Sequence, residues 1–284
     1  MSKFDNIMIV TDLDGTFFNS NRQLVQKNLD AVAYFKENGG LFAIASGREP
    51  VTLGIIAPIA PTLLNTPCPL ANGAFLYDFS TCERLDPVEL DYDKTTQLLA
   101  EVRDKFPTTS IRISTPQGYH IPYEGEYIKK ILAPFRENLL VQNAYHVSTL
   151  EEIPHCGWFR VSFDGSPEEL AGIAALIEPK YGDYFAFNLA EAEIYEFQAP
   201  TATKGQAVDR LRRRLIENGQ ADESLRVYAV GDYGNDLDLL RHADVACCPA
   251  NAIDEVKDIA SVHLCDCDDG CTADLISRIE RGEA

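Results

Sequence analysis

The sequence is short of positive charge and has no long apolar segment. Its 25 Lys and Arg residues face 44 Asp and Glu residues, giving a formal net charge of −19 at pH 7. Such a chain is a poor match for nucleic acid or for an anionic membrane surface, so we expect neither as a partner. No apolar run approaches the roughly 20 residues that cross a bilayer. The start, Met1-Ser-Lys-Phe-Asp5, lacks the charged-then-apolar layout of a signal peptide, which predicts a cytoplasmic protein.

The cysteines do not follow a zinc-binding pattern. Cys265, Cys267 and Cys271 form the only cluster that looks like a metal site, and their spacing differs from that of paired Cys-x-x-Cys sites. Cys247 and Cys248 lie next to each other in an apolar run, as buried thiols often do. We therefore expect reduced thiols rather than disulfides. Repeats and low-complexity segments are also lacking, and 284 residues suffice for one large domain or two.

Strand and helix patterns alternate at both ends of the chain. Short apolar runs predict buried strands at 7–10, 41–45 and 226–230, and a further strand-to-turn at 69–74. Amphipathic segments predict helices at 23–38, 204–218 and 272–281. This order implies right-handed crossovers and a parallel sheet.

The middle of the chain has a different pattern. A hairpin is expected over 74–90, helices at 94–106, 127–138 and 167–177, and alternating strands at 110–114, 158–163, 183–187 and 193–197. Pro134 predicts a kink in the second of these helices. Such a mixture is typical of an antiparallel sheet covered on one face. The prediction is thus an α/β protein with a Rossmann-like parallel core, residues 1–80 and 191–284, and an inserted α/β domain, residues 81–190.

Polar residues follow the predicted core strands. The set comprises Asp12 and Asp14, Ser46-Gly47-Arg48, Asn72, and Asp232 with Asn235 and Asp236. Each has an ordinary alternative, such as an Asp-Gly turn, a helix N-cap or, for Lys204, a solvated lysine at a helix start. In an open parallel sheet, however, ligands bind at the carboxyl ends of the strands. The joint occurrence of these residues favours a site over the separate alternatives.

The pair Asp12 and Asp14 suggests a particular chemistry. If the backbone stays extended through Leu13, both side chains point to the same side. Two crowded carboxylates repel each other unless a cation or a shared proton stabilises them. The pair therefore predicts a magnesium site in which one acid is ionised and the other can carry a proton.

Four segments together resemble the motifs of the haloacid dehalogenase-like (HAD) phosphohydrolases. They are Asp12-x-Asp14-Gly15-Thr16, Ser46-Gly47-Arg48, Lys204-Gly205 and Gly231-Asp232-x-x-Asn235-Asp236. The long insertion, together with Asn72-Gly73-Ala74, is similar to the Cof-type subfamily with its large α/β cap. The resemblance covers essentially the whole chain, although the cap matches by position and pattern only. Ser46 stands where many relatives have threonine, which keeps the hydroxyl.

The resemblance implies Mg²⁺-dependent hydrolysis of small phosphorylated metabolites through an aspartyl-phosphate. The substrates would be sugar phosphates or cofactor phosphates such as pyridoxal phosphate or flavin mononucleotide. Asp12 would be the nucleophile and Asp14 the acid, then the base. Lys204 would neutralise the charge shared by phosphate and Asp12. The remaining implied roles are phosphate binding by Ser46, Gly47 and Lys204, Mg²⁺ binding by Asp12, the Asp14 backbone carbonyl and Asp232, and support from Asn235 and Asp236.

Several assignments stay open at this point. Arg48 and Asn72 are possible substrate contacts, and Arg48 could instead cap a helix. In the cap, Arg112, Tyr119, His120 and Arg160 are candidates for choosing the leaving group, although a surface position is the stronger expectation for each. A phosphomutase on the same scaffold and a catalytically retired metabolite-binding protein are the alternative functions. A dehalogenase is disfavoured because carbon–halogen displacement needs neither Asp14 nor magnesium, and we expect a monomer or homodimer.

Overall fold

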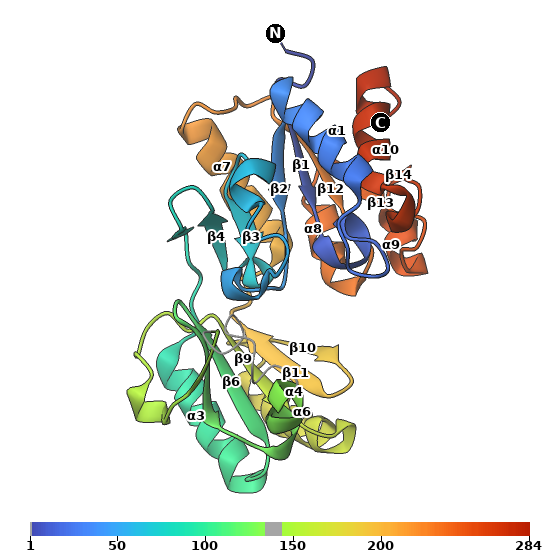
Figure 1. Cartoon of the computed structure of the whole chain (residues 1–284). Coiled ribbons are helices and arrows are strands. Elements are labelled where there is room, and N and C mark those ends of the chain that lie inside the picture. Colours follow the sequence, from blue (N-terminus) through green and yellow to red (C-terminus); the bar gives the residue numbers. More distant parts are fainter. Residues whose placement is uncertain (1, 134–143) are drawn as a thin grey trace. The chain divides into compact units, whose positions relative to one another are not determined.

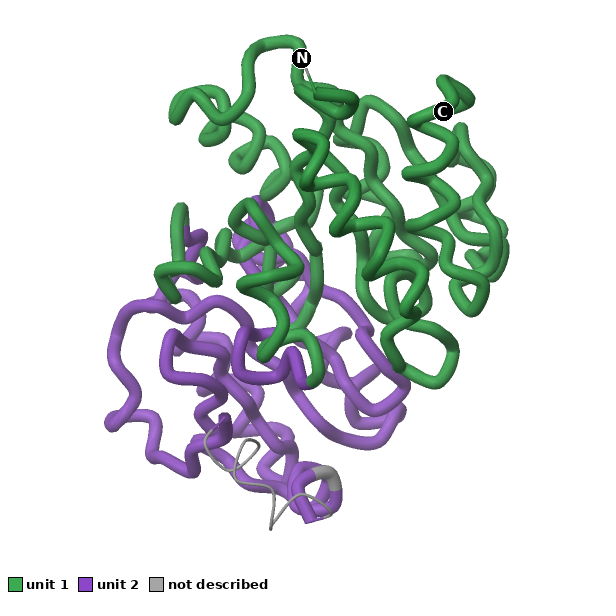
Figure 2. Tube along the Cα trace, turned by 45° about the horizontal axis from the view of Figure 1, so that its top comes forward, with its two compact units in different colours: residues 1–48, 55–86, 203–284 green, residues 49–54, 87–202 purple. Residues whose placement is uncertain are grey.

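The computed structural model describes residues 2–133 and 144–284. The chain forms two compact units (Figure 2), which are described separately below. Unit 1 comprises residues 1–48, 55–86 and 203–284, and unit 2 comprises residues 49–54 and 87–202. No helix among the described residues is both long and apolar enough to cross a membrane.

Unit 1 is built on a parallel sheet of five strands in the order β14-β13-β12-β1-β2. The strands are β1 (Ile7–Thr11), β2 (Leu41–Ile44), β12 (Arg226–Val230), β13 (Val245–Cys248) and β14 (Val262–His263). The central strand β1 pairs with β12 from Ile7 opposite Arg226 to Thr11 opposite Val230. The predicted Rossmann-like parallel core is thereby confirmed.

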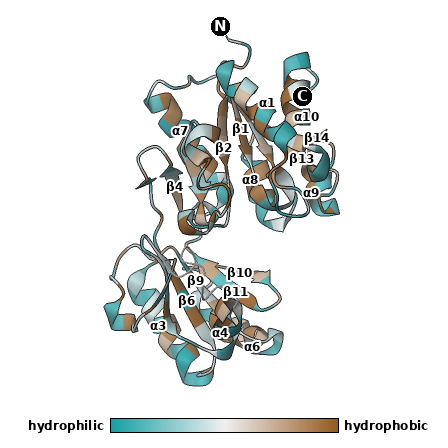
Figure 3. Cartoon of the chain, in the orientation of Figure 1, coloured by the Kyte–Doolittle hydropathy of each residue, from teal (hydrophilic) through white to brown (hydrophobic). Residues whose placement is uncertain are grey.

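Helices lie on both faces of this sheet (Figure 1). They are α1 (Gln26–Glu37), α2 (Ala60–Leu63), α7 (Lys204–Glu217), α8 (Leu237–Arg241), α9 (Asp254–Ile259) and α10 (Cys271–Arg281). Helix α1 packs against α10, and α7 packs against α8. Because both faces are covered, the consecutive residues Met8, Ile9 and Val10 of β1 are fully buried, and the strands of this sheet are coloured mainly as hydrophobic (Figure 3).

A second, antiparallel sheet completes unit 1. It contains β3 (Cys68–Leu70), β4 (Phe75–Asp78) and β5 (Glu83–Leu85). The strand expected at 69–74 was predicted to extend the parallel sheet, but β3 pairs with β4 in antiparallel register. The physical reason is the turn after β3, where Ala71 and Asn72 both have positive φ angles of 52° and 54° and reverse the chain.

Unit 2 is a six-stranded sheet in the order β10-β11-β9-β6-β7-β8, antiparallel except between β7 and β8. Its strands are β6 (Ser110–Thr115), β7 (Gly118–Tyr123), β8 (Tyr145–Val147), β9 (Arg160–Asp164), β10 (Ala186–Glu191) and β11 (Ile194–Gln198). Its helices are α3 (Tyr92–Lys105), α4 (Glu126–Leu132) and α6 (Pro167–Tyr181). Helices α3 and α6 pack together, and alternate residues of β6 and β9 join them in one hydrophobic core.

The limits of unit 2 differ from the expected insertion at 81–190. The unit extends to residue 202 because β11 pairs with both β9 and β10 and therefore belongs to its sheet. The helix expected at 127–138 is present as α4 up to Leu132. Its expected continuation, including the kink at Pro134, lies outside the described residues.

Candidate active site

Asp12 is placed by the pairing of β1 with β12. Its backbone N–H donates a hydrogen bond to the carbonyl of Val230 (2.9 Å), the last residue of β12. The two strands therefore end at the same edge of the sheet, and Asp12 lies beside the loop that begins at Gly231. Residues more than 200 positions apart in the sequence meet there, as the resemblance implied.

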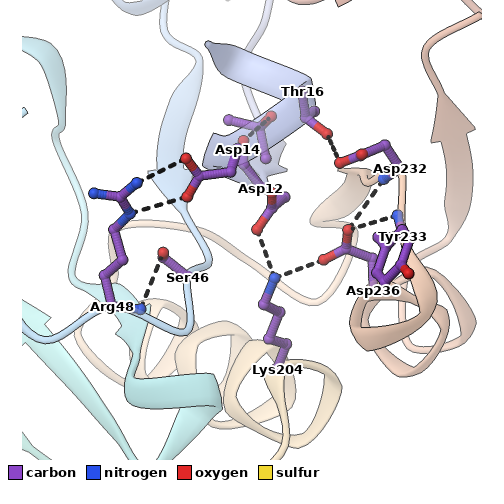
Figure 4. A network of polar contacts seen from close by, with 10 residues as sticks. Asp12, Asp14, Thr16, Ser46, Arg48, Lys204, Asp232, Tyr233 and Asp236 are labelled. Carbon is purple, nitrogen blue, oxygen red and sulfur yellow. Dashed lines mark hydrogen bonds and ion pairs between the residues drawn. The ribbon is translucent and has the colours of Figure 1, made fainter. Parts of the chain in front are cut away.

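Lys204 begins helix α7 and carries the buried positive charge of the site. Its ammonium donates to Asp12 Oδ1 and Asp236 Oδ1, both at 2.6 Å (Figure 4). Thr203 caps the helix by accepting a hydrogen bond from the N–H of Gln206 (3.2 Å), which fixes where the lysine starts. Burial alone lowers the pKa of Lys204, but Asp12 and Asp236 outweigh it and raise that pKa above its ordinary value, so the side chain is charged.

The loop after β12 is held by Asp236. The second carboxylate oxygen of this fully buried residue accepts the backbone N–H groups of Asp232 (3.0 Å) and Tyr233 (3.2 Å). Thr16 donates its hydroxyl to Asp232 Oδ1 (2.7 Å), which joins this loop to the one after β1. Asn235 lies exposed in the same loop. Asp236 thus holds the backbone of Asp232, and Thr16 holds its side chain.

Asp12, Asp232 and Asp236 form an acidic cluster, with carboxylate oxygens that lie within 4.8 Å of one another. Burial raises the pKa of Asp12 above its ordinary value, to which the charge of Asp236 contributes, while Lys204 opposes it. Burial likewise raises the pKa of Asp232 to about 6. One ammonium group does not balance three neighbouring carboxylates. A hard divalent cation, which prefers oxygen ligands, fits this donor set and its excess of negative charge.

Gly15 allows the first loop to approach the second. Its φ angle of +78° lies in the left-handed region, and a Cβ atom there would come within 2.4 Å of Asp232 Oδ2. Any other residue would be strained and would also displace the Asp232 carboxylate. The glycine of the first motif is therefore required by the geometry of the acidic cluster.

The Ser46-Gly47-Arg48 loop follows β2. Ser46 is buried, and its hydroxyl accepts the backbone N–H of Arg48 (3.2 Å). Asn72 donates its backbone N–H to the Ser46 carbonyl (3.0 Å), and a Cβ atom on Gly47 would lie 2.7 Å from the Asn72 Oδ1 atom. The structure thus brings Asn72 against the second motif, as its position after β3 suggested.

Asp14 does not point in the direction expected from an extended backbone. Strand β1 ends at Thr11, and residues 13–17 form an irregular turn in which Asp14 has φ −78° and ψ 118°. Its carboxylate accepts two hydrogen bonds from Arg48, at 2.9 Å and 2.7 Å, whereas that of Asp12 faces Lys204 (Figure 4). The expectation that the two acids share one side was wrong, because the turn begins at Leu13.

Sequence reasoning missed Asn251. Its side-chain amide donates to the Gly15 carbonyl (2.8 Å) and its oxygen accepts the N–H of Cys267 (3.0 Å). It therefore holds the peptide between Gly15 and Thr16, although it lies in a loop after β13 that carries none of the four motifs. An asparagine three residues after a buried strand, in the loop at its carboxyl end, was the signal that could have indicated it.

The four cap candidates belong to unit 2 and are buried, contrary to the expected surface positions. Arg112 forms two hydrogen bonds with Asp164, at 2.8 Å and 2.6 Å. Arg160 donates to the hydroxyl of Tyr119 (2.9 Å). His120 contacts the Ser148 hydroxyl through Nδ1 (2.9 Å). Each of these polar side chains has a polar partner inside the unit, which compensates for its burial.

Comparison with known proteins agrees with this geometry. A model of the haloacid dehalogenase-like hydrolase family matches residues 9–275. The pyridoxal phosphate phosphatase YbhA of Escherichia coli (strain K12) is 25% identical over 265 residues, which cover 91% of this chain and 93% of YbhA.

Two solved structures share the fold. A haloacid dehalogenase-like hydrolase from Bacteroides thetaiotaomicron has a TM-score of 0.79 at 21% identity, covering 97% of this chain and 99% of its own. The HAD subclass IIB sugar phosphatase BT4131 has a TM-score of 0.75 at 18% identity, covering 98% of this chain and 99% of its own. Since the family model spans nearly the whole chain, the protein belongs to the haloacid dehalogenase-like hydrolases.

Proposed function

We propose that this protein is a Mg²⁺-dependent phosphatase that hydrolyses small phosphorylated metabolites through an aspartyl-phosphate intermediate. The observation that carries the proposal is the buried Lys204 ammonium, which lies 2.6 Å from both Asp12 and Asp236. A buried cation beside a carboxylate nucleophile is an arrangement suited to phosphoryl transfer, in which charge stabilisation supplies most of the catalysis.

In the first step, Asp12 attacks phosphorus and the bond to the leaving oxygen breaks. The electron pair goes to that oxygen, which takes a proton from Asp14 and leaves as an alcohol. In the second step, Asp14 accepts a proton from water as the water attacks phosphorus. The bond between phosphorus and Asp12 then breaks, which releases inorganic phosphate and restores the Asp12 carboxylate.

The other residues bind and orient the phosphate. Lys204 neutralises the charge that Asp12 and the phosphate share, while Ser46 and the backbone at Gly47 provide hydrogen bonds to phosphate oxygens. Asp12, Asp232 and the Asp14 backbone carbonyl would hold the magnesium ion, with Asp236 fixing the loop. When bound, the ion supplies Lewis-acid stabilisation of the phosphoryl oxygens.

The substrate class follows from chemistry and from the relatives together. YbhA acts on pyridoxal phosphate and BT4131 is a sugar phosphatase, so we infer a sugar phosphate or a cofactor phosphate such as pyridoxal phosphate or flavin mononucleotide. We also infer a cytoplasmic setting, since all eight cysteines are free.

The test is a panel of phosphorylated metabolites assayed with magnesium for free phosphate. We expect wild-type turnover of at least one member and at least a thousandfold loss, roughly, in Asp12→Asn, with unchanged thermal unfolding. Full activity in this variant would refute the assignment of Asp12 as nucleophile. Return of the phosphoryl group to the product, without net phosphate release, would indicate a phosphomutase instead.

A further inference from the structure

The loop after β13 contacts both of the loops that carry the acidic cluster. Asn251 donates its side-chain amide to the Gly15 carbonyl (2.8 Å), and the N–H of Ile253 donates to the Asp232 carbonyl (3.0 Å). Asn251 and Ile253 are two positions apart in this one loop. The loop therefore links the backbone that follows β1 to the backbone that follows β12, within unit 1.

The loop after β13 is itself held by backbone contacts. The Ala252 N–H donates to the Pro249 carbonyl (3.0 Å), which closes a tight turn around Asn251. The Ala250 N–H donates to the Cys265 carbonyl (3.3 Å), in the segment that follows β14. Because these contacts join backbone atoms, they do not depend on the Asn251 side chain. A substitution of Asn251 therefore removes its amide without removing the contacts that hold the turn.

The orientation of the Asn251 amide is also determined. Its oxygen accepts the N–H of Cys267 (3.0 Å), and its nitrogen faces the Gly15 carbonyl. Exchanging the two ends of the amide would bring oxygen against oxygen and one N–H donor against another, and neither pair forms a hydrogen bond. Asn251 is thus a bridge with one donor end and one acceptor end.

Thr16 connects this bridge to Asp232. The Gly15 carbonyl belongs to the peptide that precedes the Thr16 Cα atom, and the carbonyl of Thr16 itself accepts the Cys271 thiol (3.2 Å). Both peptides beside the Thr16 Cα atom are held, which restricts its φ and ψ angles, and its β-branched side chain is restricted at χ1. The Thr16 hydroxyl donates to Asp232 Oδ1 (2.7 Å), so this residue orients the Asp232 carboxylate.

We propose that Asn251 is a positioning residue for Asp232, acting through Thr16. The Asn251 amide holds the peptide before Thr16, so the Thr16 hydroxyl orders the Asp232 carboxylate before a cation binds. Binding to a ligand that is already ordered costs less conformational entropy. The inference rests on the proposed function, in which Asp232 is a ligand of the magnesium ion.

The experiment measures the binding of Mn²⁺ to the metal-free protein without substrate. Mn²⁺ prefers oxygen ligands as Mg²⁺ does, and the electron paramagnetic resonance signal of the free ion reports how much is unbound. Removing a group that orients a metal ligand commonly lowers metal affinity about 10- to 100-fold. We expect this rise in the dissociation constant for Thr16→Val, which removes the hydroxyl itself, and a rise of about 3- to 10-fold for Asn251→Ala, which leaves the hydroxyl in place.

Turnover separates positioning from general damage. In Asn251→Ala the kcat at saturating magnesium should change less than about threefold, because the bound ion then holds the Asp232 carboxylate itself. The double variant Asn251→Ala, Thr16→Val should bind Mn²⁺ within about twofold of Thr16→Val alone, since residues that act through one another are not additive.

Asn65→Ala is the matched control. Asn65 is exposed like Asn251 and forms the same kind of bridge. Its amide donates to the Gly40 carbonyl (3.0 Å) and its oxygen accepts the N–H of Phe42 (2.8 Å). This bridge lies where β2 begins, at the opposite edge of the sheet from the acidic cluster. Asn65→Ala should therefore leave Mn²⁺ binding unchanged.

Asn251→Asp isolates the donor end of the bridge. Its carboxylate keeps an acceptor for the Cys267 N–H but has no donor for the Gly15 carbonyl. The added negative charge by itself favours a cation, so weaker Mn²⁺ binding in this variant would be due to the lost donor. This variant also tests the inference if Asn251→Ala does not fold.

Four results would overturn the inference. Unchanged Mn²⁺ affinity in Asn251→Ala would show that its amide is dispensable, and tighter binding in Asn251→Asp would show that charge alone matters. Equal weakening in Asn65→Ala would show a general structural effect. Additive losses in the double variant would mean that Asn251 does not act through Thr16. A wild-type protein that binds no divalent cation would instead contradict the proposed function.

Discussion

Replacing Lys204 by methionine tests the arrangement of charges in the site. Methionine has a similar length and no charge, so Lys204→Met removes the ammonium without opening a large cavity. The side chain of Lys204 is 1% exposed, that of Asp236 is 0% exposed and that of Asp12 is 10% exposed. Two buried carboxylates would lose the cation that each contacts at 2.6 Å.

The expected destabilisation is large. Breaking a buried ion pair by removing one partner costs about 3–5 kcal/mol, because the remaining charge is left buried without compensation. In a domain of 150–250 residues, 1 kcal/mol changes the unfolding midpoint by about 2–4 °C. We therefore expect the unfolding midpoint of metal-free Lys204→Met to be lower by about 6–20 °C, together with at least a hundredfold loss of kcat, roughly.

The assay is thermal unfolding in a chelating buffer, with Lys180→Met as the control. Lys180 contacts Glu101 at 2.5 Å but is 53% exposed, so its removal should cost about 0–1 kcal/mol. The double variant Lys204→Met, Asp236→Asn removes one of the two uncompensated charges. It should regain part of the lost stability while remaining inactive.

Two outcomes would refute this reasoning. If metal-free Lys204→Met unfolds within about 2 °C of the wild type, the ammonium does not compensate buried negative charge. If Asp236→Asn lowers the stability of the Lys204→Met protein further, the Asp236 carboxylate is stabilised chiefly by its backbone contacts with Asp232 and Tyr233.

Two further predictions concern unit 2. Asp164→Asn leaves Arg112 buried without its carboxylate and should lower the free energy of unfolding by about 3–5 kcal/mol in urea titrations; a loss below about 1 kcal/mol would contradict it. Burial, with a contribution from His146, lowers the pKa of His120 below 6.5. The unfolded state then binds more protons below pH 6.5, so the free energy of unfolding should fall as pH decreases from about 7 to 5. The His120→Gln variant should show a weaker decrease, and an unchanged pH profile would contradict the prediction.

Local patterns were sufficient to predict which polar loops the fold brings together. The apolar runs at β1, β2 and β12 are short and end in polar residues, and parallel strands end at one edge of their sheet. The position of Asp12 and Asp232 near each other follows from this rule without knowledge of any side-chain contact, whereas Lys204 begins helix α7 and was indicated by the family resemblance. Their individual roles stay predictions until variants are assayed.

The direction of Asp14 could not be predicted in the same way. It depends on the φ and ψ angles of the turn after β1 and on a guanidinium 34 residues later in the chain. Neither is visible in a pattern of apolar and polar residues. Several basic residues could have paired with Asp14, and the sequence does not indicate that Arg48 is the one that does.

The sequence patterns also did not indicate the limits of unit 2 or the burial of its polar groups. Both depend on which strands pair, and the patterns do not show that. Strand β11 alternates like any half-buried strand, and only its pairing with β9 assigns it to unit 2. Arg112 and Arg160 alternate with apolar residues and therefore resemble a solvent-exposed face. They are buried because Asp164 and Glu196 on neighbouring strands compensate their charges.

The position of β1 in the centre of its sheet determines when the core can assemble during synthesis. One of its two neighbours, β12, begins only at Arg226, so the ribosome must add more than 200 residues first. At a synthesis rate of about 5–20 residues per second, β1 is without this partner strand for roughly 10–40 s. All strands of unit 2 are made within that interval, so its sheet can fold first. The nascent chain is then a target for chaperones until its last third emerges.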